Sequence, residues 1–256
     1  MSDRPEECVV VFHAHPDDEA IFTGGTIACL NADGVRVVVV FATDGADPGT
    51  AMAATREAEA RGACALLGAH RVEFLRYADS GLRGDHRADG VVPFAAAGAT
   101  AVGRLAALLR EEHAQALVVY DEGGIYGHPD HVAVHHCGLA AAAAAGVATV
   151  YESTVDREYL HFVETHLVGH AVESLLGIEV ERINAAPLGV PTVEVSTTID
   201  VRPWASVKRA AMAAHPSQIA ADSETLTMAA DTFDGVYGFE WYVRRGPAGP
   251  LERFAF

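Results

Sequence analysis

Two histidine-rich turns, more than a hundred residues apart, hold the residue types that could do chemistry in this chain. Residues 13–19 read His-Ala-His-Pro-Asp-Asp-Glu, and residues 126–131 read Tyr-Gly-His-Pro-Asp-His. Divalent zinc binds imidazole nitrogen and carboxylate oxygen, and a catalytic zinc site keeps one position open for water. Together the two turns contain the inventory of a hydrolytic zinc site, with acids and imidazoles left over for proton transfer.

The spacing within the turns predicts which side chains would meet a metal ion. His15 and Asp18 are three residues apart, so a turn that curls into a helix brings them together, and His131 would supply a third ligand. Asp17 points away from Asp18 and is placed to take a proton from water. For Glu19, a role at the site and a simple role as a negative charge at a helix N-terminus are equally supported.

The second turn adds groups for charge stabilisation and proton transfer. Asp130 lies beside His128 in the chain. A carboxylate near an imidazole raises its pKa and fixes its orientation, so we expect a protonated His128. That imidazolium would stabilise an oxyanion or protonate a leaving amine, and both roles stay open. Tyr126 would donate its hydroxyl group to the same oxyanion.

Other histidines offer competing interpretations. His131 with His135, and His166 with His170, are each four residues apart and could hold a metal on one helix face. Neither pair has the glutamate of the H-E-x-x-H arrangement, so the pattern favours the two turns. For His215, a position on the surface is favoured over a role near the mouth of the site, and both stay open.

The apolar pattern predicts a parallel sheet that brings the two turns together. Helical segments alternate with apolar runs, which favours a doubly wound α/β sheet with helices on both faces. Ligands of such sheets bind outside the carboxyl ends of the strands, where both turns fall. Five apolar runs predict buried strands, at residues 8–12, 35–41, 72–75, 116–120 and 147–151.

We expect one domain over residues 1–256. Residues 1–151 would form a Rossmann-like core, and residues 152–256 a substrate-side elaboration with a closing helix and strand. The intervening helices are predicted at residues 19–31, 51–67 with Gly68 as the C-terminal cap, 94–112 and 129–145. The elaboration is predicted to contain a helix over 156–176, a strand at Thr192–Val195, a helix at Pro203–Ala214 and a strand at Phe239–Arg244.

Composition excludes some classes of partner. The formal net charge of −17 and the lack of a Lys/Arg cluster argue against nucleic acid. No apolar stretch is long enough to cross a bilayer, and the acidic N-terminus lacks the basic start of a secretory signal. We expect a soluble, cytoplasmic protein with no membrane partner, whose four dispersed cysteines are reduced thiols. A homo-oligomer is compatible with the sequence, which does not determine it.

These residues resemble the motifs of the LmbE-like, or PIG-L, family of zinc-dependent N-deacetylases. His15–Glu19 is similar to the first family motif, and Gly124–His131 is similar to the second. The two motifs together are highly specific. The resemblance extends to further segments, at Thr43–Gly45, Thr55–Glu59, Asp79–Gly81 and Lys208–Gln218.

The resemblance implies a Rossmann-like sheet and hydrolysis of an N-acyl group, often an acetyl group on a glucosamine, in a small-molecule substrate. It implies one zinc ion per chain, with other divalent ions such as Fe²⁺ as alternatives. The implied roles are zinc binding by His15, Asp18 and His131, general base catalysis by Asp17, oxyanion or leaving-group assistance by His128, tuning of His128 by Asp130, oxyanion contact by Tyr126, and sugar contacts by Arg56 and Asp79.

Residues 156–189 match no family segment, so the substrate stays open. An amidase acting on a thiol conjugate or a secondary metabolite would use the same metal site. A nucleotide-binding module without catalysis is disfavoured, because the first turn lacks the G-x-G-x-x-G pattern and its acids would repel a pyrophosphate. A metal-free pseudoenzyme has no support, because every proposed ligand is present.

Overall fold

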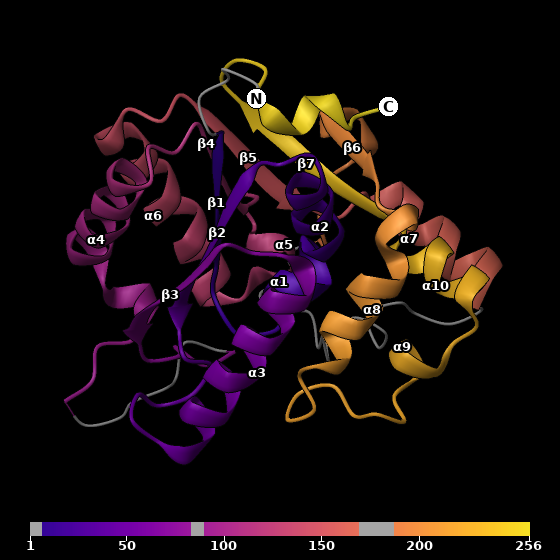
Figure 1. Cartoon of the computed structure of the whole chain (residues 1–256), viewed down its shortest axis with the longest axis horizontal. Helices are drawn as coiled ribbons and strands as arrows, with labels where there is room; N and C mark the ends of the chain where they lie inside the picture. The colour runs from indigo at the N-terminus through magenta and orange to yellow at the C-terminus, as the bar shows by residue number, and fades with distance from the viewer. Residues whose placement is uncertain (1–6, 83–89, 169–186) are drawn as a thin grey trace.

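A seven-stranded sheet runs through the residues that the computed structural model describes, which are 7–82, 90–168 and 187–256. Its strand order is β3-β2-β1-β4-β5-β7-β6 (Figure 1). The parallel strands are β1 (Cys8–His13), β2 (Arg36–Thr43), β3 (Arg71–Tyr77), β4 (Ala116–Tyr120) and β5 (Thr149–Thr154). The antiparallel strands at the other edge are β6 (Thr197–Asp200) and β7 (Phe239–Arg245).

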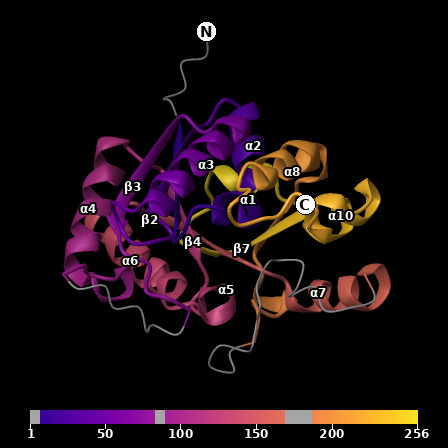
Figure 2. The same cartoon turned by 90° about the horizontal axis from the view of Figure 1, so that it is seen from below.

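Helices cover both faces of this sheet. Figure 2 separates the layers, with α2, α3 and α8 on one side and α4 and α6 on the other. The predicted, mostly parallel α/β architecture is confirmed. The α-helices of the described residues are α1 (Asp18–Phe22), α2 (Gly24–Ala32), α3 (Ala51–Leu67), α4 (Gly98–Glu111), α5 (Gly124–Gly127), α6 (Pro129–Ala145), α7 (Arg157–Val163), α8 (Ala205–Ala213), α9 (Glu224–Thr227) and α10 (Ala230–Tyr237).

The central strands are apolar throughout because both of their faces are buried. Alternate side chains of a strand point to opposite faces. In β1, Val9 and Val11 pack in the cluster that contains residues of α2 and α3, whereas Val10 and Phe12 pack in the cluster of α4 and α6. A parallel strand covered on two sides therefore reads as a continuous apolar run.

The helix predicted at residues 19–31 is broken into α1 and α2 at Thr23. Two contacts account for the break. The Thr23 hydroxyl lies 2.9 Å from Nε2 of His13, and the Glu240 carboxylate accepts the backbone N–H of Gly25 at 2.8 Å. A Cβ atom at Gly25 would lie 2.3 Å from Val201, so only glycine allows this close packing. The contacts of Gly25 with Glu240 and Val201 join this region to the last third of the chain.

The strand predicted at Thr192–Val195 is wrong. A 3₁₀ turn occupies Thr192–Glu194, with the N–H of Glu194 donating to the Pro191 carbonyl at 2.9 Å. The neighbouring strand is β6, which pairs with β7. Apolar and β-branched content alone could not choose between these adjacent segments, because strand pairing with β7 selects the register.

Two helices predicted in the second half of the chain were partly right. The helix predicted over 156–176 is α7 followed by a π-helical turn at Glu164–Val168, and its remainder lies outside the described residues. The helix predicted at Pro203–Ala214 is α8, preceded by a 3₁₀ turn at Arg202–Trp204. Within the described ranges, no helix has the length and apolar character required to span a membrane.

Candidate active site

Both histidine turns open at the carboxyl ends of neighbouring strands. β1 ends at His13 and β4 ends at Tyr120, and the two strands pair in parallel. Connections leave β1 toward β2 on one side, while β4 and β5 extend the sheet on the other. Open α/β sheets bind ligands at such a switch point. The fold therefore brings residues 13–19 together with residues 126–131.

His15, Asp18 and His131 form a buried group of possible metal donors. Nδ1 of His15 lies 3.5 Å from Oδ2 of Asp18, and Nε2 of His131 lies 3.4 Å from the same oxygen. The donor atoms of all three lie within 4.8 Å of one another. In a tetrahedral zinc site with bonds of about 2.1 Å, donor atoms are about 3.4 Å apart. The geometry of these residues therefore fits a divalent ion.

Asp18 is held as a charged carboxylate. Its Oδ2 accepts the backbone N–H of His15 at 2.8 Å. Burial would raise the pKa of Asp18, but the imidazoles of His131 and His15 hold it well below its ordinary value. An ionised oxygen between two imidazoles is the form that binds a cation.

Asp17 has the opposite environment. Its backbone has a φ of 112°, in a region that residues other than glycine rarely adopt. Burial, with the charges of Asp18 and Glu19, raises the pKa of Asp17 to about 7, although Arg56 opposes the shift. The Asp17 side chain keeps 18% of its surface exposed, against 5% for Asp18. A carboxyl group that titrates near neutral pH at the rim of a buried site suits proton transfer.

The second turn is shaped by Asp121 and by a tight approach to α6. Asp121 accepts the backbone N–H of Ile125 at 2.9 Å, and Ile125 has a φ of 65°. At Gly124, where φ is +64°, a Cβ atom would lie 2.7 Å from the backbone nitrogen of Val132. This turn places the Tyr126 hydroxyl 3.3 Å from Nε2 of His131, at the metal donor group.

Asp130 contacts a different histidine from the one expected. Its Oδ2 lies 3.2 Å from Nε2 of His15, the nitrogen that faces away from Asp18. The same oxygen accepts the backbone N–H of Ser80 at 2.8 Å. The backbone N–H of Asp130, not its carboxylate, orients His128 by donating to Nδ1 at 3.1 Å. Carboxylates that hold the second nitrogen of a metal-binding histidine fix its orientation.

The environment of His128 favours the neutral imidazole, contrary to the expectation of a protonated ring. Burial and the neighbouring imidazoles of His15 and His131 lower the pKa of His128 to about 3, although Asp130 and Asp79 oppose the shift. Because Nδ1 accepts a backbone N–H, the proton of the neutral ring resides on Nε2. The ring can therefore donate one hydrogen bond toward the site.

The two residues expected to contact a sugar differ in accessibility. The Arg56 guanidinium donates to the carbonyl groups of Pro16 at 2.6 Å and Gly45 at 2.7 Å, and its side chain is 9% exposed. The Asp79 side chain is 25% exposed, with one oxygen 3.5 Å from Nε2 of His15. Arg56 thus supports the first turn, whereas Asp79 lies at the rim of the site.

The expectation of a surface position for His215 is wrong. His215 is fully buried, and its Nε2 lies 2.7 Å from Oε1 of Glu19, which is also fully buried. Burial alone would lower the pKa of His215, but the Glu19 carboxylate raises it above its ordinary value by charge and hydrogen bond. Glu19 is therefore more than a negative charge at a helix N-terminus.

Ser80 and Asp121 were not predicted from the sequence as residues of the site. Ser80 donates a second hydrogen bond to Asp130 through its hydroxyl group, and Asp121 accepts the hydroxyl of Thr154 at 2.5 Å. Both residues act on motif residues through contacts that only the fold creates. The Asp-Ser-Gly segment around Ser80 was the available signal, and it pointed to Asp79 instead.

The competing histidine pairs do not form metal donor groups among the described residues. His135 lies 3.1 Å from the Tyr120 carbonyl and 3.3 Å from Oε1 of Glu152. These contacts turn it away from the ion that His131 would bind. His166 bonds the Phe162 carbonyl at 3.1 Å, and His170 lies outside the described residues.

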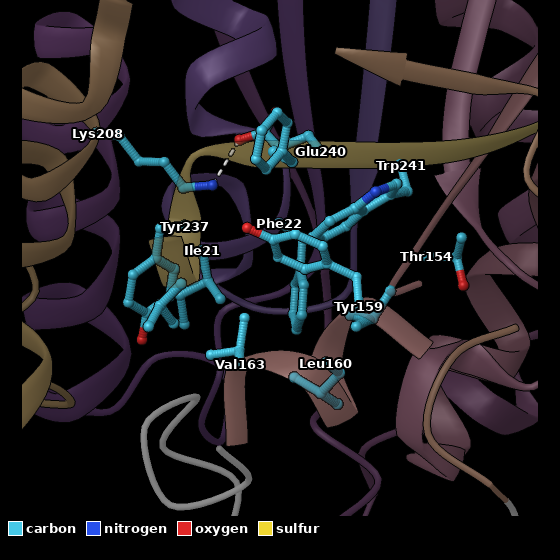
Figure 3. A pocket seen from close by; sticks show the side chains of 13 residues that line it. Ile21, Phe22, Thr154, Tyr159, Leu160, Val163, Lys208, Tyr237, Glu240 and Trp241 are labelled. Atoms are coloured by element: carbon cyan, nitrogen blue, oxygen red, sulfur yellow. Dashed lines mark hydrogen bonds and ion pairs between the residues drawn. The ribbon is translucent and has the colours of Figure 1, made fainter. Parts of the chain in front are cut away.

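An aromatic pocket is lined by residues of α1 together with residues from the second half of the chain (Figure 3). Phe22 lines this pocket, and its ring centroid is 6.2 Å from that of His131. The empty volume, including the open mouth, is about 460 Å³. Lys208 and Glu240 form a buried ion pair of 2.6 Å in its wall. Most of the remaining lining comes from the late part of the chain, including Tyr159, Tyr237, Phe239 and Trp241.

A comparison with known protein families identifies the family to which this chain belongs. Residues 10–142, which include both histidine motifs, match the family described as PIG-L: GlcNAc-PI de-N-acetylase. The chain belongs to the PIG-L family. The predicted family resemblance is therefore confirmed.

Relatives of this PIG-L protein match nearly its whole length. It is 34% identical to 1D-myo-inositol 2-acetamido-2-deoxy-α-D-glucopyranoside deacetylase 3 of Catenulispora acidiphila, over 95% of this chain and 83% of the relative. It is 32% identical to the deacetylase of the same substrate name from Streptomyces avermitilis, over 100% of this chain and 98% of the relative. Both relatives are amino-sugar N-deacetylases by name, and the expected membership in a hydrolase family of N-deacetylases is confirmed.

Solved structures show the same fold at lower identity. N,N′-diacetylchitobiose deacetylase from Pyrococcus horikoshii is 22% identical, with a TM-score of 0.59 over 94% of this chain and 84% of that chain. The 4-carboxy-2-hydroxymuconate hydratase GalB from Pseudomonas putida is 17% identical, with a TM-score of 0.60 over 95% of this chain and 98% of that chain. Because a hydratase shares it, the fold alone does not determine the reaction.

Proposed function

We propose that this PIG-L protein is a zinc-dependent enzyme that removes the N-acetyl group of an amino-sugar conjugate. The relatives named above act, by their names, on 1D-myo-inositol 2-acetamido-2-deoxy-α-D-glucopyranoside, so this conjugate is the first substrate to test. The observation that carries the proposal is the convergence of three zinc-type donors, His15, Asp18 and His131, beside the more exposed Asp17.

The donor set would hold one divalent ion. When bound, zinc polarises an amide carbonyl group and makes a water molecule more acidic. Two imidazoles and one carboxylate suit zinc, and Fe²⁺ is the alternative ion because it takes the same ligand types. The Asp130 carboxylate would hold His15 in the orientation that turns Nδ1 toward the ion.

Asp17 would act as the general base. It would accept a proton from the water that attacks the amide carbon, and deliver that proton to the nitrogen as the C–N bond breaks. The products are a free amine and acetate. Its raised pKa supports both steps, because the group can bind and release a proton near pH 7.

His128 and Tyr126 would stabilise the charge that develops on the amide oxygen. The neutral His128 ring carries its proton on Nε2, which lies 4.0 Å from Asp79 on the open side of the site. Preorganised donors of this kind act mainly on the transition state. We therefore assign His128 to the oxyanion and leave protonation of the amine to Asp17.

Asp79 is better placed than Arg56 to bind a sugar hydroxyl group. A partly exposed carboxylate beside the metal donors can accept hydrogen bonds from a ligand. The Arg56 guanidinium already donates to two backbone carbonyl groups and contacts Asp17 at 3.3 Å. Its proposed influence on the sugar is therefore through the first turn.

A second candidate substrate is an N-acylated thiol conjugate or secondary metabolite with an apolar group. The aromatic pocket of Figure 3 favours it, because Phe22 is shared between the pocket wall and the surroundings of His131. The mostly apolar lining of this pocket suits the apolar group of such a conjugate.

Amine release from both substrates tests the proposal. The purified protein should liberate amine from the inositol conjugate, lose this activity after chelation and regain it with zinc. His131→Ala should stay inactive after zinc addition, since a donor is missing. Release of amine only from the thiol conjugate would select the second substrate. Full activity in the chelated protein or in His131→Ala would refute the metal site.

We propose a small-molecule partner and a cytoplasmic location for the protein. The acidic composition and the lack of a Lys/Arg cluster support the absence of a nucleic-acid partner. Cell fractionation with a tagged full-length chain tests the location, and recovery in the membrane fraction would contradict it.

A further inference from the structure

A buried histidine–glutamate pair lies directly behind the turn that carries Asp17. The partners, His215 and Glu19, are 196 residues apart in the chain, and both side chains are fully buried. The proposed mechanism uses neither of them. Burying a carboxylate costs free energy unless it is paired and hydrogen-bonded, and both carboxylate oxygens of Glu19 have such a partner.

The second oxygen of Glu19 acts on Asp17 itself. The backbone N–H of Asp17 donates to Oε2 of Glu19 at 2.9 Å, while Oε1 accepts from His215. Asp17 is the residue with a φ of 112°. A conformation of this kind persists only where surrounding contacts over-determine it. The Glu19 carboxylate supplies one such contact, and His215 holds that carboxylate from behind.

The position of His215 is fixed by the end of α8. Its backbone N–H donates to the Met212 carbonyl at 3.2 Å, and its carbonyl accepts from Gln218 at 2.9 Å and Ile219 at 2.8 Å. The imidazole is thus carried by a rigid turn rather than by a free loop. A displacement of that turn would be transmitted to Asp17 through Glu19.

Arg56 holds the other side of the same turn. Its guanidinium donates to the Pro16 carbonyl at 2.6 Å and lies 3.3 Å from Oδ2 of Asp17. Asp17 is therefore held at its carboxylate by Arg56 of α3 and at its backbone N–H by Glu19. The two contacts come from different side chains, so a substitution can remove either one alone.

We propose that Glu19 and His215 are positioning residues that hold the base Asp17 in its strained conformation. The pair keeps the Asp17 carboxylate turned toward the substrate side while Asp18 stays with the metal donors. The importance of this position for turnover rests on the proposed function. The effect on the Asp17 backbone does not, because it depends only on the contacts described.

Kinetics of Glu19 variants test the effect on turnover. A misplacement of about 1 Å can cost on the order of a hundredfold in rate. Glu19→Ala should lower kcat by about tenfold or more, with KM and metal content close to those of the parent. Glu19→Gln should restore most of kcat, because its amide oxygen can accept the Asp17 N–H. Equal kcat for Glu19→Ala and the parent would overturn the proposal, as would a Glu19→Gln as slow as Glu19→Ala.

His135→Ala is the matched control for His215→Ala. His135 is likewise buried and 3.3 Å from a carboxylate, but its partners are Glu152 and Tyr120 rather than the base turn. Both substitutions should lower the melting temperature, and only His215→Ala should lower kcat. An equal loss of kcat in the two variants would mean that His215 acts through general stability, which overturns the proposal.

A crystal structure of Glu19→Ala decides the geometric claim without any substrate. Asp17 should leave the positive-φ region and its carboxylate should move. If Asp17 keeps its conformation, Glu19 does not position it and the inference fails. If the parent hydrolyses none of the amides, the proposed function fails, whereas this comparison still tests the inference.

Discussion

At the scale of single residues, the site is organised by two adjacent acids with opposite environments. Asp18 lies between two imidazoles, which hold its pKa low, whereas burial and neighbouring acids raise the pKa of Asp17 to about 7. Two acids whose environments shift their pKa values in opposite directions have different roles in an active site. The charged acid binds the cation and the titrating acid moves the proton. The backbone turn, with its positive φ at Asp17, keeps the two side chains apart.

The pH dependence of turnover tests the assignment of Asp17. A general base must be ionised, so kcat/KM should rise with pH up to about 7 and fall about tenfold per pH unit below that value. Asp17→Asn should lose about a hundredfold or more in kcat at pH 8, with unchanged metal content. Steady-state kinetics over pH 5–9, a window of about two units on each side of that pKa, measure both effects. An Asp17→Asn variant as fast as the parent would show that another group is the base.

The link from Ser80 through Asp130 to His15 predicts an effect on metal affinity. Ser80→Ala removes a hydrogen bond to the carboxylate that orients His15, and such losses typically weaken metal binding about tenfold or more. Competition with a zinc-binding dye measures the affinity. Ser153→Ala is the control, because the buried Ser153 hydroxyl has no hydrogen-bond partner among the described residues. Equal affinities in all three proteins would exclude the link.

At the scale of elements, the junction between α1 and α2 decides where the first turn sits. A continuous helix over residues 19–31 would remove the bend at Thr23, through which His13 is held. The Glu240 carboxylate accepts the N–H groups of Gly25 and Thr26, both at 2.8 Å, at the start of α2. A negative charge at a helix N-terminus is favourable there. Strand β7 thereby determines where the second helix begins.

Two glycine substitutions separate packing from helix propensity. Gly25→Ala should destabilise the protein by about 1–3 kcal/mol, because its Cβ atom would lie 2.3 Å from Val201. Gly62→Ala, in α3, should stabilise it by about 0.5–1 kcal/mol, because no heavy atom lies within 4 Å of the added Cβ. Urea unfolding measures both changes. A neutral Gly25→Ala would show that the α1–α2 junction is not closely packed.

At the scale of the whole molecule, the last third of the chain forms part of the sheet and of the core. β7 pairs with β5, and α8 packs against α2 and α3. Lys208, the only lysine of the sequence, is buried against Glu240 at 2.6 Å. Removing one partner of a buried ion pair strongly destabilises a protein. Residues 152–256, which were predicted as the substrate-side elaboration of a single domain, contribute β6 and β7 to the same sheet as β1–β5.

Metal binding should stabilise the folded molecule as a whole. A ligand that binds only the folded state, present at about 100 times its Kd, adds about 2.7 kcal/mol. Thermal unfolding of the chelated protein should therefore move to higher temperature on zinc addition. Asp18→Ala should lose this shift, whereas His166→Ala should keep it, because His166 belongs to no group of possible metal donors among the described residues and bonds Phe162. A shift that disappears only in His166→Ala would relocate the metal site.

Local physics made much of this protein predictable from its sequence. Helix α3 and its left-handed cap at Gly68, helix α6, and strand β4 have the predicted bounds, because periodicity, capping and burial on two faces all act over neighbouring residues. The histidine motifs indicated the chemistry, because zinc-type donors and adjacent acids are recognisable without coordinates.

Only the tertiary structure decided which groups meet across long separations. It buried His215 against Glu19, directed the Asp130 carboxylate to His15 instead of His128, and chose Thr197–Asp200 as a strand over its neighbour. The physical reason is the same in each case. Burial, charge and strand pairing depend on the whole environment of a residue, and that environment is assembled from segments that the sequence does not place side by side.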